Sequence, residues 1–219
     1  MRTRMISVLG SPGSGKSTLC GALAERYAAA GHVVDHFAEE HILTRPAFAD
    51  VAAEFAGGAG SVRPETLITA TRRYLRQSER DGAELLITDA LLPYIPSLLA
   101  WGHDEPAIDT IVAELARAAP PTEVIIVRLA DDPRATLLRA VDREGPGWLD
   151  WYVNKLRSAP GARGVTDLDS AADHLRAEAE LTRRVLQRTA WTMIELEVGD
   201  RGPADLADRA WELLAAEVR

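Results

Sequence analysis

Short apolar runs alternate with amphipathic segments along this chain. Five runs have the length of buried strands, and they lie at residues 5–9, 32–38, 84–89, 123–129 and 192–196. Apolar positions spaced three or four residues apart predict helices that include 19–30, 105–118, 169–190 and 203–218. Alternating strands and helices form mostly parallel sheets with helices on both faces. We therefore predict an α/β fold with a five-stranded, mostly parallel sheet, as a single domain over residues 1–219.

Glycine and proline mark the breaks between these elements. The glycine-rich run 57–61 predicts a flexible connection, and Pro64 fits the first position of the helix that follows. Pro120 and Pro121 are expected to end the helix over 105–118. The Gly-Pro-Gly sequence at 145–147 is expected to interrupt another helix, and this break makes residues 134–150 a candidate for a small helical lid.

Composition and charge narrow the classes of partner. The formal net charge of −8 argues against a non-specific nucleic-acid or anionic-membrane surface, because either would require a basic face. No apolar run approaches the roughly 18 residues that a spanning helix requires. Cys20 is the single cysteine, which excludes an intrachain disulfide and suits a reducing cytosol. We expect a cytoplasmic protein with small-molecule partners, and the oligomeric state, a homodimer included, stays open.

The stretch GSPGSGKST at residues 10–18 matches the phosphate-loop pattern G-x-x-x-x-G-K-S/T without a mismatch. Glycines let the backbone aim several N–H groups at one anion, and a helix that begins near Lys16 adds the positive end of its dipole. The stretch lies between a strand and a helix, as the pattern requires. We predict that it binds the phosphates of a nucleotide through Gly10, Ser11, Gly13, Ser14, Gly15, Lys16, Ser17 and Thr18.

Such a loop needs a second acid to hold Mg²⁺ or its water, at the end of a neighbouring strand. Asp89 ends the apolar run 84–89 and fits that position. We predict that Ser17 and Asp89 form the Mg²⁺ site and that Lys16 bridges the β- and γ-phosphates.

Three further groups of residues are candidates for the chemistry. Glu39 and Glu40 follow the second strand, and one of them could take the proton from an attacking hydroxyl; the sequence does not say which, and Asp35 is a weaker alternative. Arg139 and Arg143 lie four residues apart before the Gly-Pro-Gly break, so they share a helix face and could neutralise a moving phosphoryl group. A ring or base could stack on aromatic residues expected on the ligand side: Tyr94, Trp101, Trp148, Trp151 and Tyr152.

Taken together, these motifs resemble the P-loop kinase superfamily of nucleoside, nucleotide and related small-molecule kinases. Residues 10–18 are similar to the phosphate loop of adenylate-kinase-type enzymes, and Glu39-Glu40 resembles the position of the catalytic carboxylate in deoxynucleoside kinases. Asp89 resembles the third-strand acid of thymidylate kinases, and 132–147 resembles the helix and lid of these families. The resemblance implies a P-loop NTPase fold with a helical lid, ATP and Mg²⁺ as cofactors, and transfer of the γ-phosphoryl group to an acceptor.

Two departures from the family leave the acceptor open. Thymidylate and deoxynucleoside kinases follow the third-strand acid with an arginine, whereas Ala90-Leu91-Leu92 follows Asp89 here, and no Glu-Pro follows the second strand. A nucleoside or nucleotide is the first expectation for the acceptor. The alternatives are another hydroxylated metabolite, such as an antibiotic or a sugar, or a P-loop ATPase that acts as a switch, because a phosphate loop is common to switches and kinases.

Overall fold

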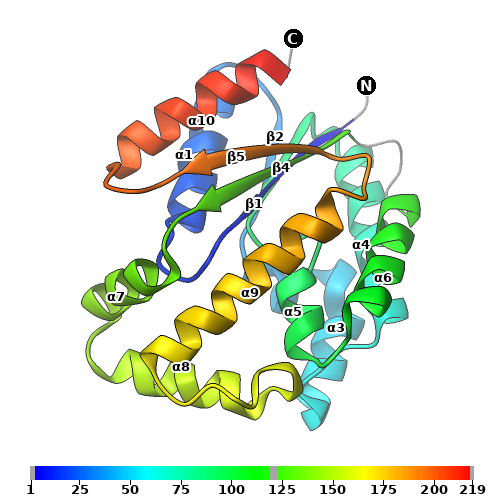
Figure 1. The fold of residues 1–219 in the computed structure, drawn as a ribbon. Helices are drawn as coiled ribbons and strands as arrows, with labels where there is room; N and C mark the ends of the chain where they lie inside the picture. The colour runs from blue at the N-terminus through cyan, green and yellow to red at the C-terminus, as the bar shows by residue number, and fades with distance from the viewer. Residues whose placement is uncertain (1–2, 119–122, 218–219) are drawn as a thin grey trace.

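The computed structural model describes residues 3–118 and 123–217, and a parallel β-sheet forms its centre (Figure 1). The sheet has five strands in the order β2-β3-β1-β4-β5, and each neighbouring pair is parallel. Its strands are β1 (Arg4–Leu9), β2 (Val34–Phe37), β3 (Leu85–Thr88), β4 (Glu123–Ala130) and β5 (Thr192–Glu197). The prediction of an α/β fold on a mostly parallel five-stranded sheet is therefore confirmed.

Helices cover both faces of this sheet (Figure 1). One face carries α1 (Lys16–Ala29) and α10 (Pro203–Glu217). The other carries α4 (Pro64–Arg80), α5 (Ile95–Ala100), α6 (Glu105–Ala118) and α9 (Leu168–Leu186). Beyond the ends of β4 and β5 lie α7 (Pro133–Glu144) and α8 (Gly147–Ser158), separated by the break that Gly145 and Pro146 make.

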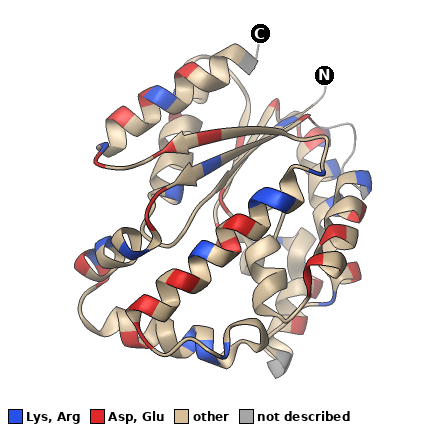
Figure 2. Cartoon of the chain, in the orientation of Figure 1, with Lys and Arg blue, Asp and Glu red and all other residues tan. Residues whose placement is uncertain are grey.

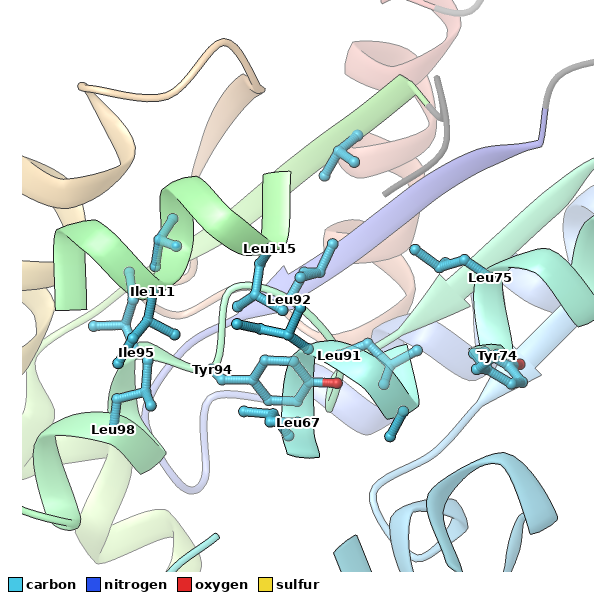
Figure 3. Close-up of a cluster of buried hydrophobic side chains, with 14 of the residues drawn as sticks. Leu67, Tyr74, Leu75, Leu91, Leu92, Tyr94, Ile95, Leu98, Ile111 and Leu115 are labelled. Carbon is cyan, nitrogen blue, oxygen red and sulfur yellow. The ribbon is translucent and has the colours of Figure 1, made fainter. Parts of the chain in front are cut away.

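Two hydrophobic cores follow from the strand period of two. Along β1, Met5 belongs to the core under α4, α5, α6 and α9, while Ile6 and Val8 belong to the core under α1 and α10. A strand buried on both faces needs a continuous apolar run, which is why the runs were readable in the sequence. Figure 3 shows part of the first core, where the Tyr94 ring lies among leucine and isoleucine side chains of α4, α5 and α6.

The segment between β2 and α4 differs most from its prediction. It is divided into α2 (His41–Thr44), a 3₁₀ turn (Pro46–Phe48), α3 (Ala49–Glu54) and a π-helical turn (Phe55–Ala59). The glycine run expected to be a flexible connection is thus partly helical, and it ends at Gly60, whose φ of +65° is left-handed. Pro64 does open α4, as predicted. The last short element is a 3₁₀ turn at Pro160–Ala162.

Three details concern the ends of helices. Asp132 caps α7, with its carboxylate accepting a hydrogen bond from the Ala135 N–H. Pro120 and Pro121, which were expected to end the helix over 105–118, lie outside the described residues. Val218, the last residue predicted for the final helix, also lies outside them. Within the ranges that are described, no helix is both long enough and apolar enough to cross a membrane.

The strand order places a topological switch point of the sheet beside β1. The chain leaves β1 toward β2 on one side, and it leaves β4 toward β5 on the other. Open parallel sheets bind ligands at such a switch point, outside the carboxyl ends of the strands. Residues 10–18 follow β1 and therefore lie at this edge.

Candidate functional site

The turn at residues 10–18 depends on glycine at two positions. Gly13 and Gly15 have φ values of +80° and +91°, in the left-handed region that glycine adopts at little cost. A Cβ atom on Gly13 would also lie 2.1 Å from the carbonyl oxygen of Thr136 in α7. The loop therefore packs directly against the backbone of α7, and a side chain at Gly13 would push the two apart.

The N-terminus of α1 is open to a ligand. The helix begins at Lys16, its N-cap Gly15 provides no side-chain cap, and its first turn has no acidic residue. The first N–H groups of a helix need partners from outside the helix, and its dipole favours a negative charge there. This end of α1 can therefore receive a phosphate group.

Lys16 lies between the loop and three carboxylates. Its Nζ atom donates to the carbonyl oxygen of Ser11 at 3.3 Å. Burial lowers the pKa of the amine, and the negative charges of Asp89, Glu39 and Glu178 act in the opposite direction. Asp89 follows β3, Glu39 follows β2 and Glu178 lies in the middle of α9, so acids of three separate segments contribute to the electrostatic field at this amine.

Ser17 and Asp89 meet at the other side of the loop. The Ser17 hydroxyl donates to Asp89 Oδ2 at 2.5 Å, while Asp89 Oδ1 is buried and has no hydrogen-bond partner. A buried carboxylate oxygen without a partner is costly, so it indicates a ligand that completes it. A hydroxyl and a carboxylate are the oxygen ligands that Mg²⁺ uses beside water and substrate phosphates. These two residues therefore fit a Mg²⁺ site.

No larger acidic or histidine cage competes with this pair. Over residues 3–118 and 123–217, no group of three His, Cys, Asp or Glu side chains is arranged to hold a metal ion. Mg²⁺ bound to one carboxylate, one hydroxyl, waters and phosphates would not need such a cage.

The backbone around Asp89 is fixed by buried hydroxyl groups. Thr88 Oγ1 accepts hydrogen bonds from the N–H groups of Ala90 and Leu91. Ser7 Oγ of β1 lies 2.8 Å and 2.6 Å from the carbonyl oxygens of Leu91 and Leu92. These hydrogen bonds tie β1 to the segment after β3 and fix the backbone that carries Asp89.

Glu39 and Glu40 both lie exposed after β2, but their surroundings differ. Glu39 contributes to the electrostatic field at Lys16. Glu40 begins α2, and its carbonyl oxygen accepts the Thr44 hydroxyl. Asp35, the weaker alternative, accepts hydrogen bonds from Arg45 at 3.0 Å and Tyr74 at 2.5 Å. Of these three acids, Glu39 is the one near the loop with its carboxylate uncommitted.

Arg139 and Arg143, which both lie on α7, contact different parts of the protein. Arg139 Nε donates to the carbonyl oxygen of Gly13 at 3.4 Å, and its guanidinium also pairs with Asp131. Arg143 lies in the last turn of α7 and pairs with its neighbour Glu144 at 2.8 Å. The structure thus brings Arg139 to the loop at residues 10–18 and leaves Arg143 at the exposed end of the helix.

The predicted aromatic group is divided between two regions. Tyr94 and Trp101 pack in the core beneath α4, α5 and α6. Trp148 stacks on Tyr152 with ring centroids 4.9 Å apart, and Trp151 is 55% exposed with Lys155 over its ring. The expectation that these five side chains gather on the ligand side is therefore wrong for Tyr94 and Trp101, because burial in the core accounts for both.

Two acids at the site were missed by reasoning from the sequence. Asp131 follows β4 directly, and its place at the end of a strand was the signal that could have singled it out. Glu178 is one of several acids along α9, where Figure 2 shows acidic and basic residues interspersed. Nothing in the sequence distinguishes Glu178 from the others, because only the packing of α9 brings it to Lys16.

Comparison with known proteins adds no assignment: no protein-family model matches the chain, and no curated protein matches it significantly.

Proposed function

We propose that this chain is an ATP-dependent phosphotransferase with a P-loop kinase-like fold. It transfers the γ-phosphoryl group of ATP to a small molecule, with a nucleoside or nucleotide as the first candidate acceptor. The observation that carries the proposal is the Ser17–Asp89 hydrogen bond of 2.5 Å beside Lys16, with the second Asp89 oxygen buried and unpartnered. The open N-terminus of α1 and the left-handed Gly13 and Gly15 support a phosphate ligand at the same place.

The donor would be held by residues of the loop. Backbone N–H groups of residues 13–18 would surround the β-phosphate, and Lys16 would contact the β- and γ-phosphates. Ser17 and Asp89 would hold Mg²⁺. The bound ion would neutralise charge on the phosphate oxygens. Arg139, which donates to the Gly13 carbonyl, would add its positive charge at the γ-phosphate.

Glu39 would act on the acceptor. Its carboxylate would accept the proton of the acceptor hydroxyl as that oxygen bonds to the γ-phosphorus and the bond from phosphorus to the β-phosphate oxygen breaks. ADP leaves with the bonding electrons, and the acceptor becomes a phosphate ester. Because Glu39 follows β2 and Lys16 begins α1, the acceptor would enter between the segment after β2 and the start of α1.

The proposal is tested first by nucleotide binding and ADP release. We expect Lys16→Ala to weaken ATP binding about tenfold or more and to remove acceptor-dependent ADP release. Lys155→Ala, on the exposed face of α8, removes the same charge and should change neither quantity. Equal ATP binding by wild type and Lys16→Ala would contradict the proposal.

ADP release also separates a kinase from a switch ATPase. Nucleosides, nucleoside monophosphates, sugars and hydroxylated antibiotics would each be added to the enzyme with ATP and Mg²⁺. Stimulation by one class supports phosphotransfer and identifies its acceptor chemistry. Hydrolysis at one rate with every compound and without any would instead support the switch.

A further inference from the structure

Asp131 is a buried acid that binds Arg139 of α7. It directly follows β4, and its side chain is 8% exposed. Of the acids that pair with arginine in residues 3–118 and 123–217, it is the least exposed. Its Oδ1 atom accepts the N–H of Asp132 at 2.8 Å, and its Oδ2 atom accepts a hydrogen bond from the Arg139 guanidinium. Both carboxylate oxygens therefore have a partner.

The backbone on either side of Asp131 is fixed. β4 lies between β1 and β5, and the Val198 N–H donates to the carbonyl oxygen of Ala130 at 2.9 Å. Asp132 caps α7, the helix that follows β4 directly (Figure 1). A carboxylate between a hydrogen-bonded strand and a capped helix keeps its position, so it can hold the side chain that it binds in one orientation.

Arg139 depends on this carboxylate for its orientation. Its side chain is 41% exposed, and its other hydrogen bond among the described residues is the one from Nε to the Gly13 carbonyl oxygen. That distance is 3.4 Å, longer than the usual N–H···O distance of about 2.9–3.0 Å. A free arginine side chain has about 2 kcal/mol of rotamer entropy to lose when it is fixed. The guanidinium has more N–H groups than these two contacts use, so donors remain for a phosphate.

The stability of the fold does not explain why this acid is buried. Burial of a carboxylate costs free energy that its attraction to one arginine often only offsets. Two other arginines of α7 pair with exposed acids. Arg134 pairs with Asp169, which is 79% exposed, and Arg143 pairs with Glu144, which is 44% exposed. Among these ion pairs of α7, the buried acid is found where the helix contacts the loop at residues 10–18.

We infer, on the basis of the ATP site proposed above, that Asp131 is a positioning residue that holds the Arg139 guanidinium at this loop for the γ-phosphate. Asp131 acts through Arg139 and contacts neither the nucleotide nor the acceptor. Because the guanidinium is fixed before the nucleotide binds, its charge acts on the γ-phosphate without reorganisation of the side chain.

The test measures the dissociation constants of ADP and of a non-hydrolysable ATP analogue, each with Mg²⁺, by calorimetry. Asp131→Asn keeps the size of the side chain and an acceptor for the Asp132 N–H, but it loses the charge that binds Arg139. It should raise the dissociation constant of the analogue about fivefold and that of ADP less than about twofold, because only the analogue has a γ-phosphate. Arg139→Ala should show the same pattern, with a rise of about tenfold for the analogue.

A double variant separates positioning from a structural role. If Asp131 acts through Arg139, adding Asp131→Asn to Arg139→Ala should weaken binding of the analogue no further. If Asp131 only supported the fold, the two losses would add. Glu195→Gln is the matched control, because Glu195 of the edge strand β5 also pairs with an arginine of β4, Arg128, at 2.7 Å. This variant should bind both nucleotides as wild type does.

Four results would overturn the inference. Equal weakening of ADP and analogue binding in Asp131→Asn, including loss of both in a protein that does not fold, would assign the ion pair to the fold. Additive losses in the double variant would do the same. Tighter binding of the analogue would show that Asp131 keeps Arg139 away from the phosphate, and two unchanged constants would show that Arg139 needs no support. Failure of the proposed function is read separately, from ATP binding in Lys16→Ala and from ADP release with acceptors.

Discussion

The part of the site formed by β1 and β3 is fixed by buried hydrogen bonds, whereas the segment after β2 consists of short pieces that bury Phe48 in the core and leave other side chains exposed. On the first side, Ser7 and Thr88 hold the backbone next to Asp89. On the second side, α2 has four residues, and Leu43 and Phe55 are 57% and 50% exposed. Stable hydrogen-bonded cores and weakly packed segments differ in how readily they open.

This difference matches the two tasks of a phosphotransferase. The donor phosphates need a preorganised set of groups, because electrostatic stabilisation is strongest where nothing has to rearrange. The acceptor has to enter, be covered and leave, which suits a weakly packed segment. Predictions for four variants test this difference, beginning with the variant that should change activity most.

The largest effect is expected on the acceptor side, at Glu39. Glu39→Gln should lower kcat about 10²- to 10⁴-fold, because the acceptor hydroxyl would lose its general base, while ATP binding should change less than about twofold. Glu40→Gln removes the same charge one residue further on and should leave kcat nearly unchanged. Steady-state ADP release and ATP titration measure both. Equal losses in the two variants would show that position 39 has no special role.

The second-largest effect on activity is expected where α7 packs against the loop at residues 10–18. Arg139→Ala should lower kcat/KM about 10²-fold, because a positive charge near the γ-phosphate is lost. Arg143→Ala, which removes an exposed arginine paired with Glu144, should lower it less than about twofold. A larger loss for Arg143→Ala would mean that α7 moves so as to bring its last turn into the site.

A third variant tests the packing of the loop itself. Gly13→Ala should destabilise the protein by about 2 kcal/mol or more, because the new Cβ meets the Thr136 carbonyl at 2.1 Å and φ is +80°. Gly21 is the control, since it lies inside α1 with no atom within 4 Å of an added Cβ, and Gly21→Ala should stabilise by about 0.5–1 kcal/mol. Urea unfolding measures both, and an unchanged Gly13→Ala would contradict the close contact with α7.

The smallest effect concerns the pH dependence of stability. The pKa of Glu178 is raised from 4.5 to about 7 in the folded protein. Below about pH 4.5 the group is neutral in both states; between pH 4.5 and 7 the unfolded chain releases the proton first, so stability falls as the pH rises. Relative to Glu178→Gln, wild type should therefore lose about 2 kcal/mol between pH 4.5 and 6.5. Parallel stability curves for the two proteins would show that Glu178 titrates normally.

Much of the fold could be predicted from the sequence because its signals are local. The strands buried on both faces are apolar runs, and Pro64, Asp132 and Pro133 mark helix starts through the chemistry of one or two residues. The segment 41–59 could not be predicted in the same way. Its pieces are too short for periodicity to identify, and their arrangement depends on packing against α4.

The residues of the candidate site show the same difference between local sequence signals and contacts that depend on packing. Residues 10–18 are contiguous, so their pattern could be recognised, and Asp89 follows from its place at the end of a strand. Asp131 follows β4 and could have been singled out in the same way as Asp89, whereas Glu178 depends on the packing of α9, which the sequence does not specify. Arg139 and Arg143 share a helix face, yet α7 ends at Glu144, and only the earlier arginine lies over the loop. The roles of all these residues stay predictions.

The most direct measurement follows the γ-phosphoryl group itself. The enzyme would be incubated with Mg²⁺, ATP that carries a radioactive γ-phosphorus, and the acceptor that stimulates ADP release most, and the products would be separated by chromatography. We expect the label in a phosphate ester of the acceptor, formed by wild type and lost in Glu39→Gln. Label found only in inorganic phosphate, released at the same rate with or without the acceptor, would contradict phosphotransfer.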